Sequence, residues 1–131
     1  MTVLNILIVD DNEASAKTLG WMMELLEHNV KLAHDGAAAI ELAKSFQPDV
    51  VLLDIGLPGM NGYEVCTAMR KEPSLETTVF IAQTGWGQNE HRERSREAGF
   101  HYHLVKPIDM DELQRLIESL RPLKEAKAAH A

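Results

Sequence analysis

Cysteine is nearly absent from this chain of 131 residues, which contains only Cys66. A single cysteine has no partner for an internal disulfide, and disulfides are typical of proteins that work in oxidising compartments. The N-terminus also lacks the basic segment and the small-residue cleavage site of a secretory signal, because it leads directly into an apolar run at 3–9. We therefore expect a cytoplasmic protein.

Long hydrophobic runs and a surplus of positive charge are missing as well. The apolar stretches have the length of strands and fall far short of the roughly 20 residues that a bilayer-spanning helix needs, so we expect no membrane segment. The formal net charge is -7, which leaves no basic field to attract a phosphodiester backbone. We do not expect nucleic acid as a direct partner.

What the chain does contain is an apolar run of strand length that recurs five times. The runs lie at 3–9, 30–33, 50–53, 79–82 and 103–105, with helix-like segments between them. Because these runs are continuously apolar and do not alternate with polar residues, we expect the strands to be covered on both faces. The pattern predicts an α/β fold with a parallel sheet and helices on both of its faces.

The segments between the strands predict helices at 12–28, 37–46, 63–70 and 89–98, and a last helix begins near Asp109. Pro122 is expected to end this last helix because proline has no backbone N–H. The length fits one domain. We expect that domain to cover residues 1–121, with residues 122–131 as a frayed tail or a stub that leads to a further segment.

Polar residues stand where four of the five predicted strands end. The first strand ends in Asp10 and Asp11, the third in Asp54, the fourth in Thr84 and the fifth in Lys106. Ligands of an open parallel sheet bind outside the carboxyl ends of the strands, so these side chains are candidate functional residues. An acidic pair alone would more often cap a helix, but four polar strand ends together favour a common site.

The chemistry of these residues suits a cation and a phosphoryl group. Three carboxylates at one edge of a sheet repel one another unless a cation lies between them, so Asp10, Asp11 and Asp54 predict a site for Mg²⁺ or Mn²⁺. Lys106 would add a flexible positive charge and Thr84 a hydroxyl donor, and both groups bind phosphoryl oxygens well. The set predicts that the Asp54 carboxylate attacks a phosphorus centre beside the cation.

This set of residues resembles the receiver domain of response regulators in two-component signalling. The resemblance covers residues 3–121 and includes LLDIGLPGMNG at 52–62, which is similar to the family's phosphorylation strand and the loop after it. It implies a five-stranded parallel sheet of flavodoxin-like order 2-1-3-4-5, the order that a chemotaxis regulator shows. It also implies that Asp54 is the phosphoacceptor and that the Gly56 carbonyl completes the protein ligands of the metal.

The resemblance implies partners and a switch too. A histidine kinase or a histidine phosphotransfer domain would donate the phosphoryl group, Thr84 and Lys106 would contact it, and the affinity for an unidentified effector protein would change. The Lys106–Pro107 bond is expected to be cis. His103 occupies the position of the family's switch aromatic, as in receivers of hybrid histidine kinases, so a switch by a tyrosine or phenylalanine ring is not implied.

Two other functions compete with a signalling phosphoacceptor. A metal-dependent phosphatase with an aspartyl-phosphate intermediate would want a second acid two residues after its nucleophile, where this chain has Gly56. A flavodoxin-like module needs a hydroxyl- and glycine-rich loop for the flavin phosphate, and the acidic segment at 10–13 would repel that phosphate. We therefore expect no conventional enzyme, but a domain whose chemistry is limited to its own phosphorylation and dephosphorylation.

The first predicted helix has a wider apolar arc than core packing requires, and part of that arc must face solvent. Because the N-terminal end of the helix follows Asp11, a partner that grips the arc would bring its phosphoryl group close to Asp54. Burial by a loop or by an oligomer is the alternative. The residues that we expect to dock the phosphodonor are Ala14, Thr18, Met22 and Leu25.

Overall fold

The computed structural model describes residues 2–85 and 96–129. One parallel sheet has the strand order β2-β1-β3-β4-β5, which confirms the predicted fold class and order. Each strand matches one of the five apolar runs of the sequence. The strands are β1 (Asn5–Val9), β2 (Asn29–Ala33), β3 (Val50–Asp54), β4 (Val79–Thr84) and β5 (Tyr102–Val105).

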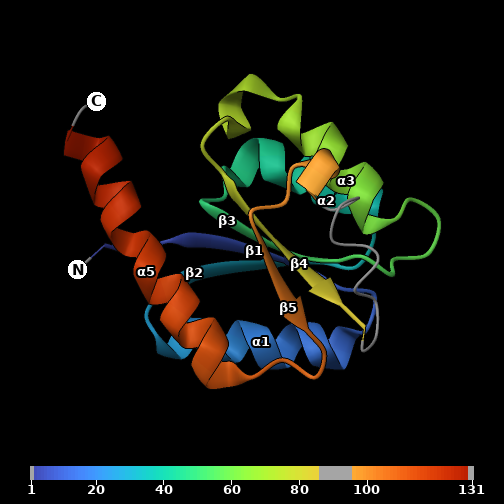
Figure 1. Cartoon of the computed structure of the whole chain (residues 1–131), viewed down its shortest axis with the longest axis horizontal. Helices are drawn as coiled ribbons and strands as arrows, with labels where there is room; N and C mark the ends of the chain where they lie inside the picture. The colour runs from blue at the N-terminus through green and yellow to red at the C-terminus, as the bar shows by residue number, and fades with distance from the viewer. Residues whose placement is uncertain (1, 86–95, 130–131) are drawn as a thin grey trace.

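Helices cover both faces of this sheet (Figure 1). The α1 helix (Glu13–Leu25) and the α5 helix (Met110–Ala129) lie on one face, and α2 (Gly36–Phe46) and α3 (Gly62–Arg70) lie on the other. A short 3-10 helix, η1 (Pro73–Leu75), follows α3. Successive strand residues point to opposite faces, so β1, β3 and β4 each contribute to two hydrophobic clusters, one under each helical layer. This burial on both faces explains why these three strands are continuously apolar.

Side-chain caps account for where several helices begin. The Asn12 side chain accepts a hydrogen bond from Ser15 N at the start of α1, and Asn61 and Glu64 form a capping box at the start of α3. Asp109 accepts hydrogen bonds from the backbone N–H groups of the first turn of α5, as the sequence predicted. The α1 helix ends at Leu25, slightly earlier than predicted, and a left-handed residue at Glu27 then turns the chain into β2.

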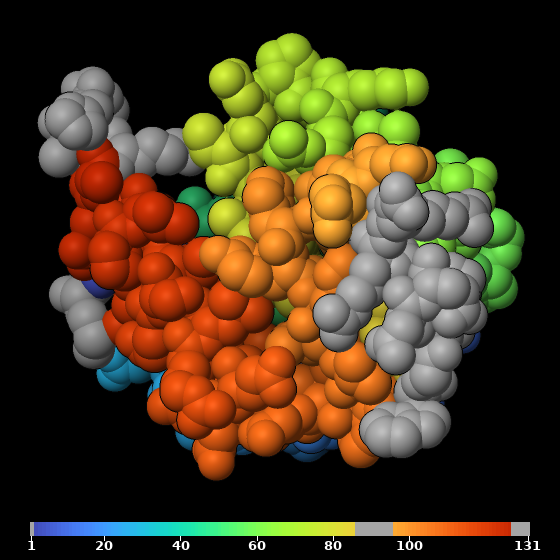
Figure 2. All heavy atoms as spheres, viewed as in Figure 1, coloured from blue at the N-terminus to red at the C-terminus, as the bar shows by residue number. Residues whose placement is uncertain are grey.

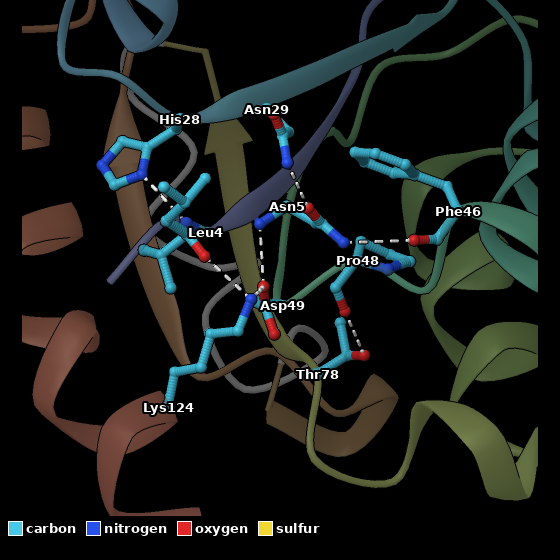
Figure 3. Close-up of polar contacts among 10 residues, drawn as sticks. Leu4, Asn5, His28, Asn29, Phe46, Pro48, Asp49, Thr78 and Lys124 are labelled. Atoms are coloured by element: carbon cyan, nitrogen blue, oxygen red, sulfur yellow. Dashed lines mark hydrogen bonds and ion pairs between the residues drawn. The ribbon is translucent and has the colours of Figure 1, made fainter. Parts of the chain in front are cut away.

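The prediction that Pro122 ends the last helix is wrong, because α5 continues through this proline to Ala129. Contacts with distant parts of the chain hold the continuation in place. Arg121 Nη2 donates a hydrogen bond to the Leu26 carbonyl oxygen at 2.9 Å. Lys124 Nζ lies 2.8 Å from the Val3 carbonyl oxygen and 2.8 Å from the Asp49 carboxylate (Figure 3). A domain boundary at residue 121 remains a prediction, but it does not coincide with the end of a helix.

The helix expected at 89–98 and the expectation of no membrane segment can be compared only with the described residues. Residues 96–98 are helical, and the rest of the helix expected at 89–98 lies outside the described residues. In the space-filling view, the coloured part of α5 lies along one edge of the molecule (Figure 2). Within residues 2–85 and 96–129, no helix combines the length and the apolar character that crossing a membrane requires.

Candidate functional site

Three carboxylates meet at the carboxyl edge of the sheet. Asp10 and Asp11 directly follow β1, and Asp54 is the last residue of the neighbouring strand β3. Each of the three can place one oxygen within 4.8 Å of the others. Asp10 and Asp54 are buried, whereas Asp11 is exposed. The structure therefore brings together the three carboxylates that the sequence assigned to one edge of the sheet.

Asp10 is the most deeply buried member of this cluster. Its Oδ1 atom accepts a hydrogen bond from the backbone N–H of Asn12 at 2.9 Å, but its buried Oδ2 atom has no hydrogen-bond partner among the described residues. Burial raises the pKa of the Asp10 carboxyl above its usual value, and the nearby Asp54 carboxylate adds to this effect. The Asn12 hydrogen bond and the charge of Lys106 offset it only in part. Asp10 thus presents a buried oxygen that makes no hydrogen bond with the described residues.

The Asp54 carboxylate is held by one backbone donor and one cation. Its Oδ1 atom accepts a hydrogen bond from Gly56 N at 2.9 Å, and its Oδ2 atom lies 3.0 Å from Lys106 Nζ. Lys106 Nζ also lies 3.7 Å from Asp10 Oδ2. Burial alone would lower the pKa of the Lys106 amine, but the hydrogen bond with Asp54 and the negative charges of the three aspartates together outweigh burial, so this pKa is raised. Lys106 therefore stays charged beside Asp54.

The backbone around these side chains keeps them in place. Lys106 N donates a hydrogen bond to the Thr84 carbonyl oxygen at 2.8 Å, which brings the end of β4 beside the lysine. The Lys106–Pro107 bond is cis, as predicted. Behind Asp54, a Cβ atom at Gly62 would lie 2.6 Å from the Asp54 carbonyl oxygen. Only glycine therefore allows the loop after β3 to pass so close to the phosphoacceptor candidate.

The remaining predicted site residues lie around this centre. Thr84 ends β4 and is buried, and Gly56 is exposed two residues after Asp54. His103 lies on β5 next to Ala82 of β4, half-buried, with its ring 6.4 Å from that of Phe100. Its ring therefore packs toward the α3 side of the sheet, whereas Asp54 and Lys106 face each other at the strand ends.

Comparison with known proteins identifies the family of this architecture. The sequence model of the response regulator receiver domain matches residues 6–118. The chain belongs to this family. A receiver is a signalling domain of response regulators and of hybrid histidine kinases, and it is not built as a classical enzyme. The resemblance drawn from the sequence is confirmed.

The relatives of this receiver include parts of larger proteins. Signal transduction histidine-protein kinase BarA of Escherichia coli (strain K12) is 32% identical over 119 residues, which is 91% of this chain but only 13% of that kinase. A crystal structure of a putative response regulator from Chloroflexus aurantiacus has a TM-score of 0.86 at 27% identity, over 92% of this chain and 99% of that one.

A receiver domain with bound metal is also similar. The receiver domain of a sensor histidine kinase from Pseudomonas aeruginosa, solved with a magnesium ion coordinated in its active site cleft, has a TM-score of 0.81. It is 30% identical and covers 90% of this chain and 97% of that one.

One residue of this receiver's site was missed by sequence reasoning. Gln83 lies on β4 directly opposite Asp54 of β3 and is only 1% exposed. Its Nε2 atom is buried and has no hydrogen-bond partner among the described residues. The signal was present in the sequence, because Gln83 interrupts an apolar run, but the predicted strand stopped one residue earlier at Ala82.

The predicted docking residues form part of the solvent-facing side of α1. Ala14, Thr18 and Leu25 are exposed and Met22 is half-buried. Trp21, which sequence reasoning did not include, is 63% exposed on the same side of the helix. The positions 14, 18, 21 and 25 follow the 4-3-4 spacing of a helix that packs along another helix. We call these four positions the α1 stripe.

Proposed function

We propose that this receiver accepts a phosphoryl group on Asp54 and that the modification changes its affinity for a protein partner. The observation that supports the proposal best is the arrangement around Asp54. One Asp54 carboxylate oxygen lies 2.9 Å from Gly56 N, and the other lies 3.0 Å from Lys106 Nζ. These two contacts fix the orientation of the carboxylate and place a positive charge beside it. A carboxylate nucleophile needs this combination of fixed orientation and an adjacent cation.

A divalent cation fits the acidic cluster. The buried Asp10 Oδ2 atom makes no hydrogen bond with the described residues and has only Lys106 Nζ, 3.7 Å away, as a nearby cation, and the raised pKa of Asp10 reflects a charge that burial disfavours. We propose that Asp10, Asp11, Asp54 and the Gly56 carbonyl would hold Mg²⁺ or Mn²⁺. When bound, the ion supplies positive charge that offsets the repulsion between the carboxylates and an incoming phosphoryl group.

Gly56, Lys106 and Thr84 would each have a separate role in the phosphorylation of Asp54. The Gly56 N–H keeps Asp54 oriented while an Asp54 oxygen bonds to phosphorus. Lys106 Nζ, which bridges toward Asp54 and Asp10 before the reaction, would follow the negative charge to the phosphoryl oxygens. The Thr84 hydroxyl would donate a hydrogen bond to the same group. Closing of these two residues on the new charge is the local change that we propose for the switch.

The partners belong to the same proposal. The phosphoryl group would come from a histidine kinase or a histidine phosphotransfer domain that docks on the α1 stripe and Met22. Enzymatic activity beyond phosphorylation and dephosphorylation of Asp54 is not proposed, nor is direct contact with nucleic acid or a membrane. The cytoplasmic location that the single cysteine suggested stays a prediction.

Intact-mass analysis after incubation with phosphoramidate and Mg²⁺ tests the assignment. We expect one added phosphoryl group on the wild type, no addition on Asp54→Asn, and no addition after the metal is chelated. Asp111→Asn is the matched control, because Asp111 is an exposed carboxylate in the first turn of α5 that does not belong to the acidic cluster, and this variant should label like the wild type. Equal labelling of Asp54→Asn and the wild type would refute Asp54 as the phosphoacceptor.

A further inference from the structure

A groove beside the phosphorylation site lies between α1 and the segment that joins β5 to α5. Its volume is about 450 Å³, enough for a small ring or side chain. Asp10 and Lys106 line both this groove and the acidic site, so any molecule that brings a phosphoryl group to Asp54 from this side covers the groove. The walls are mainly apolar or small, and they include Ala14, Thr18, Leu19, Pro107, Ile108 and Met110.

Gln83 lies at the base of this groove. Ile81, two residues before Gln83 on β4, belongs to the hydrophobic cluster under α1 and α5, and alternate strand residues share a face, so Gln83 points to the same side. Its strand neighbour in the register is Asp54. With 1% exposure and no partner for Nε2 among the described residues, Gln83 is a buried amide that still needs a hydrogen bond. The cation does not account for this need, because an amide N–H cannot ligate a metal.

We propose that the groove receives the imidazole ring of the phosphodonor and that Gln83 forms a hydrogen bond with the ring nitrogen that does not carry phosphorus. This inference rests on the proposed phosphorylation of Asp54. The apolar walls suit the faces of a flat ring. The remaining ring nitrogen is a donor when protonated and an acceptor when it is not, and a glutamine amide offers both functions, whereas Lys106 can only donate. Gln83 is thus a specificity residue for imidazole as the leaving group.

The phosphoryl transfer needs only the Asp54 carboxylate and the phosphorylated ring as reactants. An Asp54 carboxylate oxygen forms a bond to phosphorus, and the bond between phosphorus and the ring nitrogen breaks with its electron pair going to that nitrogen. The proton already on the other ring nitrogen makes the departing imidazole neutral. The Gln83 Oε1 atom accepts a hydrogen bond from this ring N–H and holds the ring during departure, whereas Gln83 Nε2 donates to the same ring nitrogen when the donor binds unprotonated.

Two small phosphodonors test the proposal without a partner protein. N-phosphoimidazole contains the ring, and phosphoramidate transfers the same group without it. We expect Gln83→Met, which keeps the length of the side chain but cannot form the hydrogen bond, to lower the ratio of the two phosphorylation rate constants (phosphoimidazole over phosphoramidate) by about tenfold. Gln114→Met is the matched control, because it makes the same substitution at an exposed position of α5 that does not line the groove, and it should leave this ratio within about twofold.

A second measurement does not depend on a variant that folds. Imidazole titrated into the wild type should shift the NMR signals of the Gln83 side-chain amide more than those of Gln47, an exposed glutamine far from the groove. An unchanged rate ratio in Gln83→Met, or equal losses with both donors, would overturn the proposal and leave the amide bound to water only. Failure of both donors to label Asp54 in the wild type would instead overturn the proposed function, and this inference with it.

Discussion

Burial at single residues decides which side chains of this receiver are chemically available. Asp10 and Cys66 are both buried, yet burial has opposite consequences for function at the two positions. At Asp10 one buried carboxylate oxygen, Oδ2, makes no hydrogen bond with the described residues, although it lies next to Lys106 and Asp54. At Cys66 the thiol is enclosed in the hydrophobic cluster under α2 and α3. Asp10 can therefore bind a ligand, whereas the Cys66 thiol is shielded from reagents.

Cys66 should therefore be inert in the folded protein. Burial raises the pKa of its thiol to about 12, so almost no thiolate is present near neutral pH, and the thiolate is the reactive form. We expect no reaction with the reagent DTNB at pH 8 until urea unfolds the chain, measured by the released chromophore. Ser45→Cys, which places a second thiol on the exposed side of α2, should add a fast phase. A fast reaction of the native wild type would contradict the burial of Cys66.

At the scale of elements, α1 and α5 lie on the same face of the sheet but differ in what they expose (Figure 1). The α1 helix buries Leu19 and Met23 and leaves Trp21 and Leu25 exposed to 63% and 76%. Large apolar side chains exposed in a row on a helix indicate an interaction surface. The α5 helix instead extends past the sheet edge and is tied to it by Lys124.

A charge in the α1 stripe should impair docking of a protein phosphodonor. We expect Thr18→Lys to lower the rate of transfer from an autophosphorylated histidine kinase that labels the wild type by about tenfold or more, because the lysine must lose water in an apolar contact. Labelling by phosphoramidate should persist, since the site itself is intact. Glu24→Lys, outside the stripe on the same helix, is the control. Equal loss with both donors would indicate a damaged fold.

The continuation of α5 beyond Pro122 should depend on Lys124. This side chain is about a third exposed, so its ion pair with Asp49 is screened, and its loss in Lys124→Ala should lower the free energy of unfolding by only about 0.5–1 kcal/mol. Locally the effect should be larger. We expect faster hydrogen exchange at residues 123–126 but not at 113–120, measured by mass spectrometry. Similar protection of both segments in the variant would show that the helix continues without this contact.

The whole molecule couples its stability to pH through a buried histidine where the two ends of the fold meet. His28 Nδ1 accepts a hydrogen bond from Leu4 N at 3.1 Å (Figure 3), and its Nε2 lies 3.2 Å from Arg121 Nη2. Burial, reinforced by the charge of Arg121, lowers the pKa of His28 below 6.5. Glu118 and Asp49 act in the opposite direction but do not cancel this effect. The folded protein therefore keeps His28 neutral where the unfolded chain would protonate it.

The contribution of His28 to the stability of the protein should consequently fall on acidification. As the pH falls below about 6.5, the unfolded state binds a proton at His28 and the folded state does not, so the free energy of unfolding declines until the lower folded-state pKa is reached. His101, whose pKa burial also lowers, acts in the same direction. Urea unfolding at pH 7.5 and 5.5 measures the loss. His28→Asn should reduce the difference between the two pH values, and an undiminished difference would contradict the assignment.

Much of this receiver was determined by the sequence itself. Continuous apolar runs indicated a parallel sheet, because only strands covered on both faces tolerate them. The polar residues that end those runs then had to gather at one edge, since parallel strands end on the same side. Asp10, Asp54 and Lys106 could be assigned to one site for this reason, before any distance was known. The exposed part of the α1 arc followed from periodicity alone.

Tertiary structure alone decided the features that depend on residues far apart in the chain. Pro122 looks like a helix end by local rules, but contacts to Leu26, Val3 and Asp49 hold the helix beyond it. Gln83 gains its significance from the register that sets it opposite Asp54 and from a groove that α1 closes over it. The pKa values of Asp10, His28 and Lys106 likewise reflect burial and neighbours that no local pattern contains. Periodicity reports which face of an element is buried, whereas pairing and burial depth arise only when distant elements pack.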